Sequence, residues 1–365
     1  MKKSKIMMVI NDLRCGGAER VFVYIADGLS QHFDVHVINT MGQYYDFFSI
    51  QKAKYHSVEK LYGDPHLRHL KRVAKLQKLY DDIMPDVIIA FLDEAIAYAG
   101  SIARNCPLIV SERNDPNHAN DDEVIEVGRR ETYNNCELIV VQSTDAEKYF
   151  SDFKCSSQII KIVNPLAIMG DIVPYKDRKN EIVAVGRLSE QKNYPLMIIA
   201  FSEFVQVHPE YVLKIYGKEY GMRDEYIELA RRYRVNNKVI FMGESSNVIE
   251  DIKHAKMFLM TSNYEGLPNA LLEAMGMGIP PICTECFGGI RDLVLHENNG
   301  LLVPIGNKNA IVAALCQVAE NSELAERISI EATKVRLNFE ANTILNKWRK
   351  TVIDTIQSYH KGEPE

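Results

Sequence analysis

The chain has 365 residues, of which 46% are hydrophobic and 25% are charged, and its formal net charge is −6. This composition is ordinary for a globular protein, and the length suits two domains of roughly 170–190 residues. The acidic balance argues against general binding to nucleic acid, so we expect no nucleic-acid partner.

Cysteine usage and the N-terminus indicate the cellular compartment. The seven cysteines are scattered, which is typical of reduced thiols in a cytosolic protein. Cys283 and Cys286 form a single Cys-x-x-Cys pair with no second pair or histidine cluster beside it, so we expect no metal site there. No apolar run reaches the roughly 18 residues that cross a bilayer. The short apolar stretch after the basic N-terminus is expected to form a core strand rather than a signal peptide, and we expect a cytoplasmic protein.

The first elements indicate a β-loop-α-β unit. Residues 6–10 are predicted to form a strand, residues 18–29 a helix and residues 35–39 the next strand. Gly16 and Gly17 stand where the first strand passes to the helix. They either make the turn or let a substrate phosphate approach the helix N-terminus. The pattern is not Gly-x-Gly-x-x-Gly, so NAD is not expected.

An amphipathic helix is predicted over residues 67–80. Its apolar positions are expected to face the core, and they are Leu67, Leu70, Ala74, Leu76 and Leu79. Its basic residues are expected on the outer face, with no acidic residue among them, and they are Arg68, Lys71, Arg72, Lys75 and Lys78. This face is either merely solvated or binds an anionic membrane surface or the diphosphate of a lipid.

Further strands are predicted at residues 87–92, 108–110, 138–141 and 159–163. The polar cluster 111–116 follows one of them, at the strand edge where open α/β sheets bind ligands. The pattern then becomes irregular over residues 164–180, which predicts a linker. We therefore expect an N-terminal domain at 1–170, a C-terminal domain at 171–340 and a last helical segment at 341–365.

The second domain carries the residues with the clearest chemistry. A strand at 182–185 is followed by Gly186, Arg187 and Lys192, which can place two cations on one diphosphate. Glu265 follows a strand at 257–260, and Glu273 lies about two turns along a helix expected to begin at Pro268. Carboxylates can hold sugar hydroxyls, and a helix N-terminus attracts phosphate. There is no metal-binding Asp-x-Asp, so positive side chains would carry the charge of the leaving group. This combination predicts a nucleotide-sugar transferase that requires neither metal nor cofactor.

The ordered motifs resemble the retaining family-4 glycosyltransferases of the GT-B fold over nearly the whole chain. The matching pieces are Gly16-Gly17-Ala18-Glu19, Gly186-Arg187-Leu188 with Lys192, Glu265-Gly266-Leu267-Pro268 through Glu273-Ala274, Gly278-Ile279-Pro280 and Asn299-Gly300-Leu301-Leu302-Val303. Within the family, residues 16–20 and 111–116 resemble bacterial enzymes that extend polyprenyl-diphosphate-linked glycans, N-acetylgalactosamine transferases among them.

The resemblance implies an α/β protein of two Rossmann-like domains facing each other across a cleft, the first binding the acceptor and the second a UDP-linked sugar. It implies catalytic roles for Glu265, Arg187 and Lys192. The donor-binding residues would be Gly16, Gly17, Gly186, Gly266, Leu267, Pro268, Asn269 and Glu273. The family often has a histidine after the strand that ends at Ser111, and Glu112 or Arg113 holds that place here. The last helix would cross back to the first domain.

The leading hypothesis is therefore a retaining, metal-independent hexosyl or N-acetylhexosaminyl transferase, with GalNAc favoured. It would act on a lipid-linked or other glycan acceptor, peripherally on the cytoplasmic face of the inner membrane. One rival is a nucleotide-sugar epimerase or hydrolase, for which only Glu112 and His118 are candidate acid/base groups. A second is a non-catalytic nucleotide-sugar-binding partner, against which the joint presence of Arg187, Lys192 and Glu265 argues.

Overall fold

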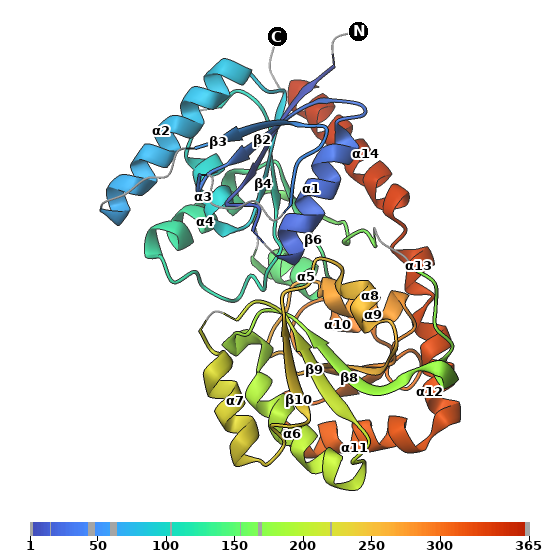
Figure 1. Cartoon of the computed structure of the whole chain (residues 1–365). Coiled ribbons are helices and arrows are strands. Elements are labelled where there is room, and N and C mark those ends of the chain that lie inside the picture. Colours follow the sequence, from blue (N-terminus) through green and yellow to red (C-terminus); the bar gives the residue numbers. More distant parts are fainter. Residues whose placement is uncertain are drawn as a thin grey trace. The chain divides into compact units, whose positions relative to one another are not determined.

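The computed structural model describes residues 3–14, 16–42, 48–58, 64–102, 104–153, 155–166, 170–219 and 221–361. The chain divides into two compact units (Figure 1). The first unit comprises Met1–Pro165 and Ala341–Glu365, and the second comprises Leu166–Glu340. The six cysteines that the structure describes are free thiols.

The first unit is built on a parallel sheet. Within the described residues this sheet has seven strands in the order β3-β2-β1-β4-β5-β6-β7. Their bounds are β1 Lys5–Ile10, β2 Asp34–Asn39, β3 Lys54–Ser57, β4 Val87–Phe91, β5 Leu108–Ser111, β6 Leu138–Val141 and β7 Gln158–Lys161. The strand β3 is short and polar and lies at the edge of the sheet, and it lacks the apolar run of the central strands.

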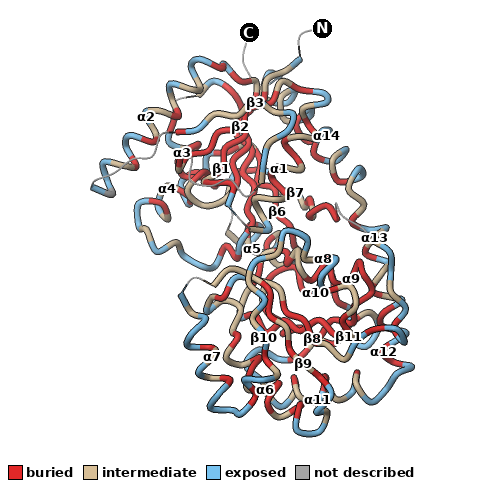
Figure 2. The backbone as a smooth tube through the Cα atoms, viewed as in Figure 1, coloured by how far each residue is buried: buried red, intermediate tan, exposed pale blue. Residues whose placement is uncertain are grey.

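Helices cover both faces of this sheet because its strands are apolar on both sides. In β1, Met7 and Val9 join one core cluster, while Ile6, Met8 and Ile10 join the other. The first cluster packs under α2 (Pro65–Ile83), α3 (Asp93–Ser101), α4 (Glu123–Asn135) and α5 (Thr144–Phe153). The second packs under α1 (Gly17–Leu29) and α14 (Ala341–Lys361), where Trp348 is fully buried. Figure 2 shows this buried sheet between more exposed helices.

The sequence assigned the faces of α2 correctly only in part: Leu76 is buried and Lys71 and Lys78 are exposed, as expected. Leu67 and Leu70, expected in the core, are 54% and 67% exposed. Arg72, expected on the outer face, is buried and donates to the Tyr98 hydroxyl at 3.0 Å. The reason is tertiary: His69 lies within hydrogen-bonding distance of both Tyr98 and Asp122, which turns the polar His69–Arg72 edge of the helix inward.

The second unit repeats the architecture. Within the part of the chain that the structure describes, its parallel sheet has six strands in the order β10-β9-β8-β11-β12-β13. The strand bounds are β8 Lys179–Val185, β9 Val212–Tyr216, β10 Val239–Gly243, β11 Ala255–Met260, β12 Pro281–Thr284 and β13 Leu301–Val303. The helix bounds are η1 Tyr175–Asp177, η2 Glu190–Lys192, α6 Tyr194–Val207, α7 Arg223–Arg232, α8 Val248–Ile252, α9 Asn269–Gly276, α10 Ile290–Leu293, α11 Lys308–Glu320, α12 Ser322–Ala332 and α13 Val335–Asn338.

Strand order places two loops of the second unit side by side. The chain runs outward from β8 through β9 to β10, then returns to pair β11 with the other side of β8. Such a reversal is where open parallel sheets bind ligands, at the carboxyl ends of the two central strands. The loops after β8 and β11, which contain Lys192 and Glu265, meet at this position.

The helices offer no candidate for a membrane span. Among the described residues, none is both long enough and apolar enough to cross a bilayer.

Candidate active site

The centre of the site is an ion pair between Lys192 and Glu265. Lys192 ends the short helix η2 after β8, and Glu265 lies in the loop after β11. Lys192 Nζ donates to Glu265 Oε1 at 2.5 Å. The Glu265 side chain is 6% exposed and that of Lys192 is 15% exposed, so solvent screens the pair weakly. The structure thus brings together the two residues that the sequence placed on separate loops.

Ser262 is a site residue that sequence reasoning missed. Its hydroxyl donates to Glu265 Oε1 at 2.6 Å, so this oxygen accepts from both Ser262 and Lys192. The Ser262 carbonyl in turn accepts from the hydroxyl of Thr284, at the end of β12, at 2.6 Å. Its position three residues before Glu265 was the available sequence signal, but the spacing alone does not reveal the contact.

Hydrogen bonds hold the two loops to each other. The Thr261 hydroxyl donates to the carbonyl oxygens of Lys192 and Asn193 at 3.0 and 3.1 Å. Gln191 Nε2 donates to the Tyr264 carbonyl at 2.9 Å. These bonds fix the backbone on both sides of the ion pair, so Lys192 and Glu265 are positioned by the scaffold.

A glycine in a third loop permits close packing behind Glu265. Gly288 has φ +117, and a Cβ added there would lie 2.1 Å from the Glu265 carbonyl oxygen. The neighbouring Gly289 N–H donates to the Gly266 carbonyl at 2.6 Å. Only glycine combines this backbone conformation with this approach, so the loop after β12 supports Glu265 from behind.

The β8 loop supplies a second cation. Arg187 is exposed, and its side chain has no hydrogen-bond or ion-pair partner among the described residues. The neighbouring Gly186 carbonyl accepts from the Tyr194 hydroxyl at 2.8 Å. Burial raises the pKa of Tyr194, with the Glu265 carboxylate adding to the effect, so this phenol stays neutral and donates. The Arg187 side chain is therefore accessible to an anion, and the hydrogen bond from Tyr194 to Gly186 holds the loop that carries it.

Glu273 lies on helix α9, which begins at Asn269, one residue later than expected. Pro268 is the N-cap residue, and its carbonyl accepts from the Leu272 N–H at 3.1 Å. Glu273 is buried on the second turn of this helix. Gly278, with φ +70, follows the end of the helix.

Glu112 belongs to a buried network in the first unit. Its Oε1 accepts from the backbone N–H groups of Arg113 and Asn114 at 2.8 and 2.9 Å. Its Oε2 accepts from the Tyr133 hydroxyl and lies 3.7 Å from Arg129 Nη1. Burial raises the pKa of Glu112, and nearby Asp93 adds to this rise. The arrangement gives Glu112 a structural role at the end of β5, and a catalytic role for it stays a prediction.

Arg113 is also buried. Its guanidinium carbon lies 4.2 Å from the ring centroid of Phe91, and its Nη1 donates to Asn164 Oδ1 at 2.6 Å. Burial lowers its pKa to about 9. The Nε and Nη2 atoms of Arg113 have no hydrogen-bond partner in the described part of the chain, so two nitrogen atoms of the guanidinium remain able to donate. A role in binding substrate stays a prediction for this residue too.

Gly16 and Gly17 begin helix α1. Gly16 is the N-cap residue and has an extended backbone. A Cβ added to it would lie 2.0 Å from Glu19 Oε2, so the Glu19 carboxylate packs directly against this glycine. The helix start is therefore closely packed, and the approach of a phosphate to it stays a prediction.

Comparison with known proteins assigns the activity class. Residues 171–335, which contain Arg187, Lys192, Glu265 and Glu273, match the family model described as Glycosyl transferases group 1. One relative is the GalNAc-alpha-(1->4)-GalNAc-alpha-(1->3)-diNAcBac-PP-undecaprenol alpha-1,4-N-acetyl-D-galactosaminyltransferase of Campylobacter jejuni. It is 25% identical over 363 residues, which cover 96% of this chain and 98% of that protein.

Solved structures show the same fold. Sucrose-phosphate synthase from Thermosynechococcus elongatus has a TM-score of 0.85 at 16% identity, covering 98% of this chain and 100% of that one. HepE from Anabaena, solved with UDP and glucose, has a TM-score of 0.81 at 21% identity, covering 96% of this chain and 99% of that one. Residues 171–335 therefore form a glycosyltransferase segment, and the whole chain has the GT-B fold.

This class favours the transferase hypothesis over both rivals. An epimerase or hydrolase was predicted to use Glu112 and His118, and Glu112 is already bonded within its own unit. The glycosyltransferase instead has its accessible cation, Arg187, on the same loop as Lys192.

The basic helix of the glycosyltransferase presents a mixed surface. Lys71 and Lys78 are exposed, as are Leu67 and Leu70, whereas Arg68 and Lys75 are half-buried. Arg72 does not contribute to this surface because it is buried against Tyr98. Exposed leucines beside lysines make the outer face of α2 apolar as well as basic.

Proposed function

We propose that this glycosyltransferase moves a hexose or N-acetylhexosamine, with GalNAc favoured, from a UDP-sugar to a polyprenyl-diphosphate-linked or other glycan acceptor. The acceptor would belong to the assembly of a surface polysaccharide or a glycoprotein glycan. The observation that carries the proposal is the Lys192–Glu265 pair beside exposed Arg187, at the carboxyl edge of the sheet and inside the family-matched segment. Support for the substrates comes from the names of the relatives, one acting on a PP-undecaprenol glycan and one solved with UDP.

The proposed donor contacts follow from the chemistry of the side chains. Arg187 and Lys192 would hold the diphosphate, since a guanidinium and an ammonium both suit phosphate oxygens. Glu273 would accept from the ribose hydroxyls, and Glu265 from the hydroxyls of the transferred sugar. Gly266, Leu267 and Asn269 would offer backbone N–H groups near the start of α9. The glutamates would thus hold hydroxyls rather than act as an acid/base pair.

The proposed reaction retains the anomeric configuration. The bond from the anomeric carbon to the diphosphate oxygen breaks, and the acceptor hydroxyl attacks on the same face. Its proton passes to the departing phosphate oxygen. Arg187 and Lys192 would stabilise the charge that develops on the diphosphate, which is the work that a metal ion performs in other phosphate chemistry. We therefore propose transfer without a required metal.

The first unit would bind the acceptor. Gly16 and Gly17 would let a phosphate of the donor approach the start of α1, and Glu112 or Arg113 would stand in for the histidine that the family often has. The outer face of α2 would dock on anionic lipid at the cytoplasmic side of the inner membrane, using Lys71 and Lys78 for the headgroups and Leu67 and Leu70 for the interface.

A donor panel tests the proposal. Purified protein is incubated with several UDP- and GDP-sugars and a diphosphate-linked lipid glycan, with and without a chelator. We expect glycan extension from one UDP-sugar, unaffected by the chelator and absent in Glu265→Gln, with retained configuration by NMR. Interconversion of nucleotide sugars without glycan extension would instead support the epimerase, and full inhibition by the chelator would refute metal independence.

A further inference from the structure

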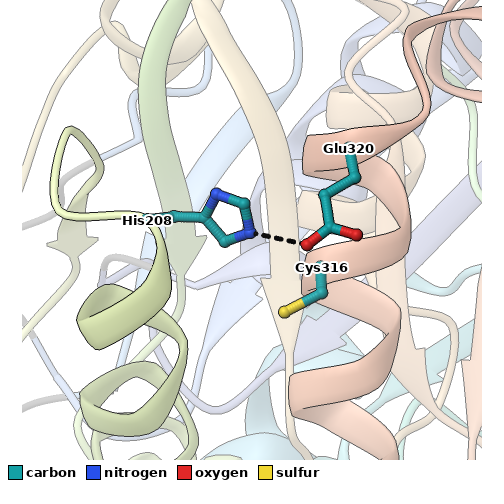
Figure 3. Close-up of side chains that lie close together, drawn as sticks. All are labelled: His208, Cys316 and Glu320. Atoms are coloured by element: carbon teal, nitrogen blue, oxygen red, sulfur yellow. Dashed lines mark hydrogen bonds and ion pairs between the residues drawn. The ribbon is translucent and has the colours of Figure 1, made fainter.

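A second group of reactive side chains lies in the second unit, apart from the donor residues. Among the residues that the structure describes, His208, Cys316 and Glu320 form one group whose ligating atoms all lie within 4.8 Å of one another. His208 is the C-cap residue of α6, and Cys316 and Glu320 are one turn apart on α11. All three side chains point into the space between the two helices (Figure 3).

The chemistry of the three ligands is specific. An imidazole nitrogen, a thiolate sulfur and a carboxylate oxygen are the three protein ligand types of zinc. Zinc bonds of about 2.0–2.3 Å place ligands of a tetrahedral site roughly 3.3–3.8 Å apart. His208 Nε2 and Glu320 Oε1 are already 3.1 Å apart. The other pairs of ligand atoms lie within 4.8 Å of each other. Side-chain rotations that move an atom by about 1 Å would bring them to the separations of a tetrahedral site.

The surroundings orient the His208 ring toward α11. The ring stacks on Phe204 with centroids 4.8 Å apart and planes at 28°. Its Nδ1 lies 3.7 Å from Glu210 Oε1, while Nε2 faces Glu320. Metal-binding histidines usually donate from the second ring nitrogen to a carboxylate, and Glu210 stands on that side of the ring, although at 3.7 Å it is beyond hydrogen-bonding distance.

We propose that His208, Cys316 and Glu320 bind one zinc ion or a similar borderline divalent cation, with water as the fourth ligand. The ion would tie the end of α6 to α11 and stabilise the second unit. It would not take part in transfer: Lys192 precedes the start of α6 and His208 follows its end, and these 14 residues span about 21 Å. The inference is therefore independent of the proposed donor site.

The competing explanation is an ion pair alone. His208 and Glu320 can join the two helices without a metal, and Cys316 would then be a bystander. The thiol separates the two explanations. A bound metal would be coordinated by the Cys316 sulfur, which an ion pair between His208 and Glu320 does not involve.

Cobalt titration of the tag-free, full-length protein tests the site. We expect one equivalent of Co²⁺ to produce a near-ultraviolet thiolate-to-cobalt band that Zn²⁺ abolishes. Cys316→Ser should lose the band. Glu320→Gln, which keeps a hydrogen-bond partner for His208, should weaken Co²⁺ binding at least about tenfold. Cys155→Ser is the matched control, since Cys155 is likewise a half-buried free thiol and should leave the titration unchanged.

Thermal unfolding supplies a second readout. A saturating concentration of Zn²⁺ should raise the Tm of the wild type by about 5 °C, and that of Cys316→Ser much less. Absence of the cobalt band in the wild type, or its survival in Cys316→Ser, would overturn the proposal. A Tm that responds equally to Zn²⁺ in both proteins would overturn it as well. None of these three results bears on the proposed donor site, because transfer is measured in a separate experiment.

Discussion

Lys192 Nζ lies 2.5 Å from Glu265 Oε1, although the two residues are 73 positions apart in the chain. Ser262 donates to the same carboxylate oxygen. An ammonium group has three donors, so Lys192 can keep Glu265 and still bind a phosphate oxygen. In the proposed reaction, the pair would therefore position a cation for the diphosphate and a carboxylate for the sugar before any substrate binds.

Removing the ammonium should affect both transfer and stability. In Lys192→Met we expect transfer to fall at least about 100-fold, because the charge on the leaving diphosphate loses its cation. The unfolding free energy should fall by roughly 1–3 kcal/mol, because Glu265 is left buried without a counter-charge. The double variant Lys192→Met/Glu265→Gln should stay inactive but regain much of this stability. Steady-state kinetics and urea unfolding measure the two effects, and wild-type turnover in Lys192→Met would refute the site.

Ser262→Ala should separate positioning from binding. Loss of one hydrogen bond to a charged group predicts a fall in kcat of about tenfold, with the donor KM changed by less than about threefold. Ser202→Ala is the control, because Ser202 is also buried but donates to the Ile199 carbonyl within α6. It should change stability and leave kcat intact. Equal kcat values for the two variants would argue against a positioning role for Ser262.

Gly288→Ala should be far more damaging than an alanine at another left-handed glycine. Gly288 has no room for a Cβ beside the Glu265 carbonyl, whereas a Cβ at Gly306, with φ +73, meets nothing within 4 Å. We expect Gly288→Ala to lose about 3 kcal/mol or more of unfolding free energy, and Gly306→Ala only about 1 kcal/mol. Urea unfolding of both variants measures this difference. If the two variants lost similar amounts of unfolding free energy, backbone strain alone, and not packing against Glu265, would explain the destabilisation.

The outer face of α2 should be required for membrane binding. Reversing the exposed charges in Lys71→Glu/Lys78→Glu should weaken co-sedimentation with anionic liposomes at least about tenfold, since each basic residue near the surface contributes about 1 kcal/mol. Arg231→Glu/Arg232→Glu reverses two exposed charges on α7 and is the matched control. If both double variants bind liposomes like the wild type, the exposed face of α2 is simply solvated.

Stability should depend on pH through Glu94. Burial raises the pKa of this carboxyl group from 4.5 to about 6. Between these values the folded protein holds a proton that the unfolded chain has released, so the unfolding free energy falls as pH rises through this window. Glu94→Gln removes the effect, and we expect it to be about 1–2 kcal/mol more stable than the wild type at pH 7 and nearly equal at pH 4. Urea unfolding at both pH values measures this, and a pH-independent difference would contradict it.

Local patterns were sufficient to predict the main strands and to place the candidate donor residues relative to them, while the donor role of these residues stays a prediction. Apolar runs bounded by glycine or polar loops predicted the central strands of both sheets, because a strand buried on both faces must be apolar throughout. The positions of Arg187, Lys192, Glu265 and Glu273 also followed from the sequence, since each belongs to a motif anchored to a predicted strand or helix.

Relationships between distant segments required the structure. Ser262 and Gly288 became site residues only when the loops after β11 and β12 met, and Arg72 turned inward only because Tyr98 lies beneath it. Periodicity predicts which residues share a face of a helix, but not which polar residue has a hydrogen-bond partner in the core. For this reason Leu70 was predicted to be buried and Arg72 exposed, and the structure shows the reverse. The sequence by itself determined which residues are candidates for binding a nucleotide sugar. The tertiary structure decided which of them meet, because burial and hydrogen bonding depend on neighbours that the linear order separates.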